Sequence, residues 1–144
     1  MRLIVLAGLP GSGKSTWAAG QDFSVLSSDG VRLLLADDVT IQTIHRRVFT
    51  TLRQLARQRL AIGRPFTCID ATNLTRWERR QWIRLAAAGG AEAEAIFFNT
   101  PLEVCLDRNA HRERVVPADV VRDMARRLEP PTIAEGFARV ITLT

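Results

Sequence analysis

Gly8-Leu9-Pro10-Gly11-Ser12-Gly13-Lys14-Ser15 is the stretch that decides the fold of this chain of 144 residues. It matches the pattern Gly-x-x-x-x-Gly-Lys-Ser/Thr of a P-loop, whose glycines let successive backbone N–H groups point at phosphate oxygens. Lys14 is the only lysine among the 20 Lys and Arg residues, as expected where a compact ammonium suits the chemistry better than a planar guanidinium. The motif therefore predicts a nucleotide-binding protein, and a glycine-rich turn without a ligand is the weaker alternative.

The segments around the motif fit the strand–loop–helix setting that a P-loop requires. Residues 3–7 are apolar throughout, as in a buried parallel strand, and residues 15–19 begin a helix. Lys14 is expected to reach the outer phosphates, and the Ser15 hydroxyl is expected to be a ligand of Mg²⁺. The residues predicted to bind the nucleotide within this segment are Gly8, Pro10, Gly11, Ser12, Gly13, Lys14, Ser15 and Thr16.

The composition is that of one domain, residues 1–144, with a basic surface. A net charge of +5 favours an anionic partner, although a bound nucleotide accounts for part of that preference. Cys68 and Cys105 lie in apolar runs without metal-type spacing, which predicts small buried hydrophobes in a reducing compartment. The apolar run after Arg2 is too short for a membrane span or a convincing signal peptide, so a cytoplasmic location without a membrane partner is expected.

Five apolar runs have the length of buried strands, at residues 3–7, 23–26, 66–69, 95–98 and 140–143. Helical periodicity alternates with them at residues 40–60, at 75–88, from a predicted capping box at Thr100–Glu103 onward, and at 117–128. Such alternation predicts an α/β fold of the P-loop type, with a parallel sheet of about five strands and helices on both faces. Its strands then end at one edge, where ligands bind.

The second and third strand ends carry candidate carboxylates. Asp29 is suited to accept a proton from an attacking hydroxyl, and Arg32, three residues later, to hold an anionic group of the acceptor. The equally weighted alternative is that Ser28 or Asp29 only caps the following helix. Asp70 ends an apolar run beyond the P-loop, which favours a Walker B carboxylate that holds Mg²⁺ over a simple turn residue.

Two further segments are rich in arginine. Arg108, Arg112 and Arg114 resemble a lid that neutralises the transferring phosphoryl group, although a solvated helix end is the alternative and fits Arg114 best. Arg76, Arg79, Arg80 and Arg84 lie near a helix N-terminus, where cations are unfavourable, so either a nucleic-acid backbone or pairing with Glu78 accounts for them. The three tryptophans, Trp17, Trp77 and Trp82, are expected to pack in the core or between helices.

Several separate stretches together resemble the kinase domain of 5′-hydroxyl polynucleotide kinases. They are residues 8–18, Asp29 with Arg32, residues 70–73, Arg108–Asn109 with Arg112, and the tail at 128–137. The phage enzyme is the nearest comparison for the Asp-x-x-Arg pair and the lid, and animal polynucleotide kinase-phosphatases for the tail. The Asp-x-Asp-x-Thr motif of a phosphatase is absent from the sequence, and Ser28 stands where the phage pattern has arginine.

This resemblance implies a P-loop kinase fold and a mechanism with ATP and Mg²⁺ as cofactors. Lys14 would act on the phosphates, Asp29 would be the general base, and Arg112, with Arg108, would stabilise the transferred phosphoryl group. Arg32 would hold a phosphate of the acceptor. Thr72 and Asn73 would also contact the substrate, which is the 5′-hydroxyl end of DNA or RNA. The alternatives are a kinase of small-molecule hydroxyls with the same fold and a non-catalytic nucleotide-binding module.

Overall fold

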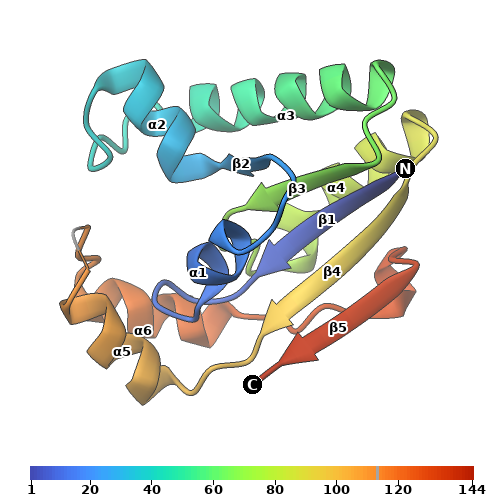
Figure 1. Ribbon diagram of the computed structural model, residues 1–144. Helices are drawn as coiled ribbons and strands as arrows, with labels where there is room; N and C mark the ends of the chain where they lie inside the picture. The colour runs from blue at the N-terminus through green and yellow to red at the C-terminus, as the bar shows by residue number, and fades with distance from the viewer. Residues whose placement is uncertain (113) are drawn as a thin grey trace.

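A computed structural model of the protein describes residues 1–112 and 114–144, in which five parallel strands form one sheet. The strands are β1 (Arg2–Ala7), β2 (Val25–Ser27), β3 (Phe66–Asp70), β4 (Glu92–Phe98) and β5 (Arg139–Leu143). Their order across the sheet is β2-β3-β1-β4-β5, and all four pairings are parallel (Figure 1). The five apolar runs of the sequence predicted all five strands. The central strands β1, β3 and β4 are almost fully buried, as expected for parallel strands covered on both faces, whereas the edge strands β2 and β5 are only partly buried.

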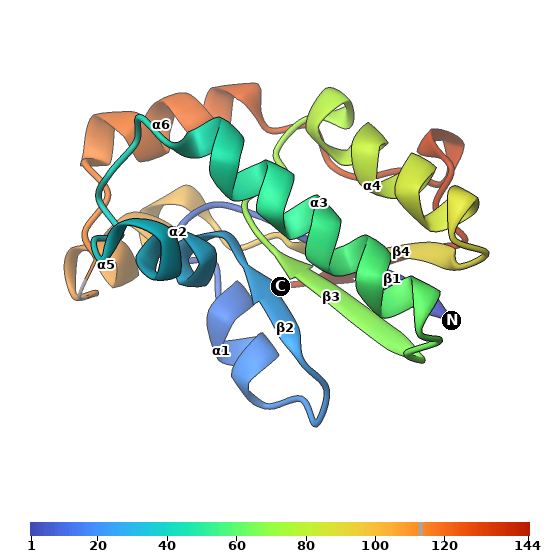
Figure 2. The same cartoon turned by 90° about the horizontal axis from the view of Figure 1, so that it is seen from above.

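Helices lie on both faces of the sheet, as the sequence predicted. They are α1 (Lys14–Ala19), α2 (Ser28–Ala36), α3 (His45–Ala61), α4 (Arg76–Ala88), α5 (Leu102–Ala110) and α6 (Ala118–Arg127), followed by a 3₁₀ turn, η1 (Ile133–Glu135). Figures 1 and 2 show α3 and α4 on one face, α1 on the opposite face, and α5 and α6 near the carboxyl ends of the strands. Among the described residues, no helix is both long and apolar enough to span a membrane.

Two apolar clusters bury the two faces of the sheet. The larger contains Val48 and Leu52 of α3 and Trp82 of α4, packed on inward-facing residues of β1 and β4. The smaller joins Ala18 of α1 to the other face of the same strands, with Phe98 among its members. Cys68 and Cys105 are both fully buried free thiols, as their apolar surroundings predicted.

The third helix begins at His45, five residues later than the predicted start at residue 40. Thr40 is held in a turn instead, because its backbone N–H and its hydroxyl both donate to Asp38 Oδ1, at 2.8 and 2.6 Å. Such local side-chain bonds compete with helix formation. Ile44 is the residue that precedes the helix, and it makes no side-chain cap.

Candidate active site

A cavity of about 600 Å³ lies at the carboxyl ends of β1, β2 and β3. Its wall brings together the P-loop, both candidate carboxylates and all three lid arginines. The lining residues are Pro10, Gly11, Gly13, Lys14, Ser15, Thr16, Trp17, Ser27, Ser28, Asp29, Asp70, Ala71, Thr72, Phe98, Arg108, Arg112 and Arg114. Most of the residues that the sequence predicted for the site therefore share one cavity, although they come from four separate parts of the chain.

The backbone of the P-loop is fixed by its contacts with α5 and the segment before it. Gly11 has a φ of +82°, and a Cβ at this position would lie 2.6 Å from the backbone oxygen of Cys105, so only glycine fits. The Thr100 hydroxyl donates to Ser12 O at 2.8 Å. Thr100 therefore supports the loop, and the predicted capping box at Thr100–Glu103 is wrong: Pro101 precedes α5 without any side-chain cap.

Lys14 is buried within the loop that carries it. Its ammonium donates to Gly8 O at 2.9 Å and to Leu9 O at 2.8 Å, and the residue is only 8% exposed. Burial lowers the pKa of Lys14 to about 8, although the nearby carboxylate of Asp70 opposes that shift. The ammonium is thus desolvated and held by carbonyl oxygens that a phosphate can replace.

Ser15 and Asp70 lie together, as a magnesium site requires. The Ser15 hydroxyl donates to Asp70 Oδ2 at 3.0 Å. Burial raises the pKa of Asp70, while the charge of Lys14 and the bond from Ser15 partly offset that effect. A hydroxyl and a carboxylate are hard oxygen ligands, and Mg²⁺ at phosphate sites needs only one or two of them from the protein. The residues present therefore fit Mg²⁺.

Asp29 faces the cavity because another residue caps its helix. Ser27 Oγ accepts a hydrogen bond from Gly30 N at 3.2 Å and is the N-cap of α2, so the alternative that Ser28 or Asp29 caps this helix is wrong. The Asp29 side chain is 35% exposed, and its Oδ1 accepts a hydrogen bond of 2.7 Å from Arg114 Nη1. The carboxylate is thus available to a ligand in the cavity.

Arg32 lies behind Asp29 and is not among the residues of the cavity wall. It is 4% exposed, with Nη1 at 3.5 Å from Asp29 Oδ1 and Nη2 at 3.4 Å from His45 Nδ1. Its Nε is buried without a hydrogen-bond partner, alone among the side-chain N and O atoms of residues 1–112 and 114–144. The predicted direct contact between Arg32 and the acceptor does not fit this position, which instead suits the orientation of Asp29.

The three arginines of the lid (Arg108, Arg112 and Arg114) all reach the cavity. The sequence spacing predicts Arg108 and Arg112 on one helix face, but α5 ends at Ala110, and Arg112 N donates to Asn109 O at 3.2 Å in the turn that follows. A solvated helix end is the expectation for Arg114, yet this residue makes the shortest ion pair of the site. Glu113, within the same segment, lies outside the described residues.

Asn73 does not reach the cavity, so its predicted contact with the substrate is not supported. The residue is 2% exposed and adopts a φ of +44°. Its amide donates to Leu6 O at 2.7 Å, and its Oδ1 accepts from Trp82 Nε1 at 3.1 Å. Asn73 therefore ties the end of β1 to α4 inside the protein, whereas its neighbour Thr72 lines the cavity as predicted.

The sequence of this chain matches one family model and is similar to curated kinases. A family model described as an AAA domain matches residues 3–131. A bifunctional polynucleotide phosphatase/kinase from Schizosaccharomyces pombe is 25% identical over 143 residues, covering 96% of this chain and 32% of the relative. An L-seryl-tRNA(Sec) kinase from Methanococcus maripaludis is 24% identical over 135 residues, covering 90% of this chain and 53% of the relative. The chain thus spans about a third to a half of the length of these curated relatives.

The fold also has close counterparts among solved structures. One chain in a structure of the Pnkp1/Rnl/Hen1 RNA repair complex superposes with a TM-score of 0.75 at 22% identity, over 88% of this chain and 43% of that one. At this level of identity the likeness concerns the fold. Together with the sheet order and the P-loop, it identifies the α/β P-loop kinase fold that the sequence predicted.

Proposed function

The chain belongs to the AAA domain family, and from this membership and the geometry of its cavity we propose that it transfers the γ-phosphoryl group of ATP to the 5′-hydroxyl end of DNA or RNA. One observation carries the proposal. A single cavity holds a P-loop lysine, a hydroxyl–carboxylate pair suited to Mg²⁺, and a second carboxylate, Asp29, that is not used as a helix cap. A kinase needs those three parts, whereas a module that only binds nucleotide needs no second carboxylate.

Asp29 is assigned the removal of the proton from the acceptor hydroxyl. During transfer, the acceptor hydroxyl oxygen forms a bond to the γ-phosphorus, the bond to the β–γ bridging oxygen breaks, and ADP leaves. Asp29 accepts the proton that the hydroxyl loses, and Arg32, 3.5 Å behind it, orients the carboxylate. Arg114 holds the same oxygen at 2.7 Å from the side of the lid.

Stabilisation of charge is the part assigned to the P-loop and the lid. Lys14 exchanges its bonds to Gly8 O and Leu9 O for bonds to the phosphates of ATP. Arg108 and Arg112 line the cavity and suit the negative charge that spreads over the transferring phosphoryl group. Ser15 and Asp70 would hold Mg²⁺, which neutralises phosphate charge when bound.

The choice of acceptor rests on the basic character of the chain and on its relatives. A net charge of +5 favours a polyanionic acceptor over a neutral sugar or nucleoside. The relative in Schizosaccharomyces pombe is a polynucleotide phosphatase/kinase. Phosphorylation of a small-molecule hydroxyl is the alternative, because the same Lys14, Ser15 and Asp29 would serve it.

The proposal is tested by transfer of labelled γ-phosphate from ATP to a short oligonucleotide with a 5′-hydroxyl. The same oligonucleotide with a 5′-phosphate is the matched control, and Lys14→Ala and Asp29→Asn are the control variants. We expect the wild type to label only the 5′-hydroxyl strand. Neither variant should label either strand. Transfer to sugars or nucleosides but not to the oligonucleotide would establish the small-molecule alternative. Full activity of Asp29→Asn would remove the general base from the proposal.

A further inference from the structure

Trp77 is a large aromatic side chain that the protein leaves in solvent. It is 77% exposed on the first turn of α4, whereas Trp82 of the same helix is fully buried. The expectation that all three tryptophans pack in the interior is therefore wrong for Trp77. The indole contributes little to the core, and because single exposed apolar side chains are common on protein surfaces, its significance depends on the residues around it.

Arginines surround this exposed indole. The guanidinium carbon of Arg80 lies 5.9 Å from the centroid of the Trp77 ring. A cavity of about 270 Å³ is lined by Arg76, Trp77, Arg80, Ile83 and Glu135. Arg76 and Arg80 are both exposed, and no side-chain ion pair involves either of them within the described chain.

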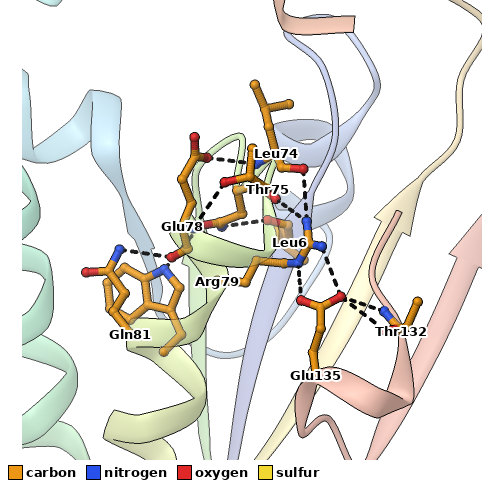
Figure 3. Close-up of polar contacts among 10 residues, drawn as sticks. Leu6, Leu74, Thr75, Glu78, Arg79, Gln81, Thr132 and Glu135 are labelled. Atoms are coloured by element: carbon orange, nitrogen blue, oxygen red, sulfur yellow. Dashed lines mark hydrogen bonds and ion pairs between the residues drawn. The ribbon is translucent and has the colours of Figure 1, made fainter. Parts of the chain in front are cut away.

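The acidic residue of this cavity is paired with Arg79, and Arg76 interacts with it only through its charge, without an ion pair. Glu135 accepts two hydrogen bonds from Arg79 (Figure 3), from Nε at 2.8 Å and from Nη2 at 3.0 Å. The side chains of Glu135 and Arg79 are 3% and 0% exposed. Arg79 Nη1 also donates to Asn73 O and Leu74 O. Arg79 is therefore a structural residue and is unavailable to nucleic acid. It differs in this respect from Arg76, Arg80 and Arg84, with which the sequence pattern grouped it.

These buried contacts hold the first turn of α4 in place. Thr75 Oγ1 caps the helix by accepting from Glu78 N at 3.2 Å, and Arg79 ties the turn to η1. Trp77 and Arg80 thus project from a fixed backbone. A rigid aromatic platform loses little conformational entropy when a ligand binds.

The position of α4 connects this surface to the catalytic cavity. Thr72 lines that cavity, and Trp77 follows five residues later, so their Cα atoms are at most ~18 Å apart. Arg76, Arg80 and Arg84 recur every fourth residue, which gives a stripe about 12 Å long on one side of the helix. Arg84 also lines a groove with Arg53 and Arg57 of α3. Arginines therefore follow one another along the surface of α4 and continue onto α3.

From these observations we infer that Trp77, Arg76 and Arg80 form a binding site for single-stranded nucleic acid. A base stacks on the indole, and Arg76 and Arg80 bind the flanking phosphates. An exposed indole face suits an unpaired base, because bases within a duplex are already stacked on one another. The site extends the proposed function and rests on it: that function supplies the strand end in the catalytic cavity, and Trp77 holds the strand a few nucleotides away.

Binding is tested without catalysis, with the full chain and a fluorescently labelled single strand of 12 nucleotides, by fluorescence anisotropy without ATP. We expect Trp77→Ala to weaken binding about tenfold or more and Trp77→Phe to retain most of it, since a stacked base contributes about 1–3 kcal/mol. Arg80→Glu should weaken binding and flatten its dependence on salt, by about 0.7 in the log–log slope for each phosphate that the protein no longer binds.

Arg64→Glu is the matched control. Arg64 is exposed in the loop that precedes β3, so it lies at the amino end of that strand, whereas the catalytic cavity lies at the carboxyl ends of the strands. This variant makes the same change of charge and should leave affinity within about twofold of the wild type. Thermal unfolding of each variant checks that the fold is intact. Equal affinity of Trp77→Ala and wild type, or equal weakening in Arg64→Glu and Arg80→Glu, would overturn the inference, as would a blunt duplex that binds as tightly as the single strand.

The phosphate-transfer assay separates this inference from the proposed function. If the wild type labels the 5′-hydroxyl strand and Trp77→Ala binds that strand normally, the inference fails and the kinase stands. If the wild type labels no nucleic acid but Trp77→Ala and Arg80→Glu lose affinity for the single strand, the site stands and the kinase proposal fails. If both hold, Trp77→Ala should raise the KM for the strand more than it lowers kcat.

Discussion

Arg114 Nη1 donates a 2.7 Å hydrogen bond to Asp29 Oδ1, and so joins the lid to the carboxylate at the start of α2. The two residues are 85 positions apart in the sequence. Asp29 is also held by Arg32 from behind, so two cations converge on one carboxylate oxygen. The position of the candidate base therefore depends on where the lid lies.

Replacement of Arg114 tests this dependence. Arg114→Ala should lower kcat for phosphate transfer about 10- to 100-fold, because a hydrogen bond to a charged group contributes about 1.5–3 kcal/mol. ATP affinity, measured by calorimetry, should change little. Arg122→Ala, on the exposed side of α6, is the control. A higher kcat in Arg114→Ala would mean that the pair holds Asp29 away from its working position.

Replacement of Asp29 itself should separate chemistry from binding. Asp29→Asn keeps the shape of the side chain but removes its ability to accept a proton. We expect kcat to fall roughly 10²–10⁴-fold with ATP affinity within about threefold of the wild type. Single-turnover rates and calorimetry measure the two quantities separately. A large decrease in ATP affinity with an unchanged single-turnover rate would assign Asp29 to nucleotide binding instead.

The Ser15–Asp70 pair predicts how the protein responds to Mg²⁺. Removal of Mg²⁺ by EDTA should abolish phosphate transfer while the thermal unfolding curve stays the same. Asp70→Asn should raise the Mg²⁺ concentration for half-maximal transfer about tenfold or more, because it removes one of the few protein oxygen ligands. Asp22→Asn, in the exposed loop before β2, should leave the titration unchanged. An unaltered Mg²⁺ titration in Asp70→Asn would exclude this carboxylate as the ligand.

Two glycines with nearly the same positive φ allow the packing of the P-loop to be measured. Gly11 has a φ of +82° and Gly63 a φ of +80°, but a Cβ on Gly11 would lie 2.6 Å from Cys105 O, whereas a Cβ on Gly63 would have nothing within 4 Å. Gly63→Ala should therefore cost only the left-handed strain, about 1–2 kcal/mol in the free energy of unfolding. Gly11→Ala should cost more and should also weaken ATP binding. If chemical denaturation shows equal destabilisation in Gly11→Ala and Gly63→Ala, α5 can shift to accommodate the added Cβ at no cost in free energy.

The buried Arg79–Glu135 pair predicts a dependence of stability on pH. Burial alone would raise the pKa of Glu135, but the hydrogen bonds from Arg79 and Thr132 and the charge of Arg79 outweigh it and lower that pKa. A lowered carboxyl pKa stabilises the folded state above the unfolded value of 4.5, and this contribution is lost as the pH falls through the folded pKa. Glu135→Gln should thus be less stable at pH 7 by about 3 kcal/mol and lose less stability than the wild type below about pH 4.5.

Urea denaturation at pH 7 and at about pH 3.5 measures both effects, since the lower value lies below the ordinary pKa of a glutamate. Glu129→Gln, a nearby exposed carboxyl group, is the control and should match the wild type at pH 7. The prediction is contradicted if Glu135→Gln and Glu129→Gln unfold at the same urea concentration at pH 7.

The sequence predicted the sheet and most of the cavity because both depend on local patterns. Apolar runs mark buried parallel strands, and the spacing of the P-loop residues determines the geometry of that loop. Because parallel strands end at the same edge of a sheet, the side chains that follow them meet there. The roles assigned to Lys14, Asp29 and Arg112 remain predictions until they are tested by mutation.

The errors concern residues whose surroundings are set by distant parts of the chain. The partner of Arg79 is Glu135, 56 positions away, and that of Arg114 is Asp29, 85 positions away. Asn73 resembles a turn residue at an active-site edge, but Leu6 and Trp82 draw its side chain inward. Local spacing carries no information on such pairings. It left Arg79 open between a nucleic-acid backbone and Glu78 and Arg114 open between the lid and a solvated helix end, and it did not indicate that the Asn73 side chain is buried.

The isolation of Lys14 gives this protein a built-in chemical reporter. It carries the only side-chain amine in the sequence, and its pKa of about 8 leaves a substantial fraction as the nucleophilic free amine in mildly alkaline buffer. Lys14 is thus the one internal amine that an acylating reagent can modify, although it is only 8% exposed, and the extent of its modification can be read directly by mass spectrometry. Because a phosphate on the P-loop would shield that amine, the rate of modification would report how fully the loop is occupied.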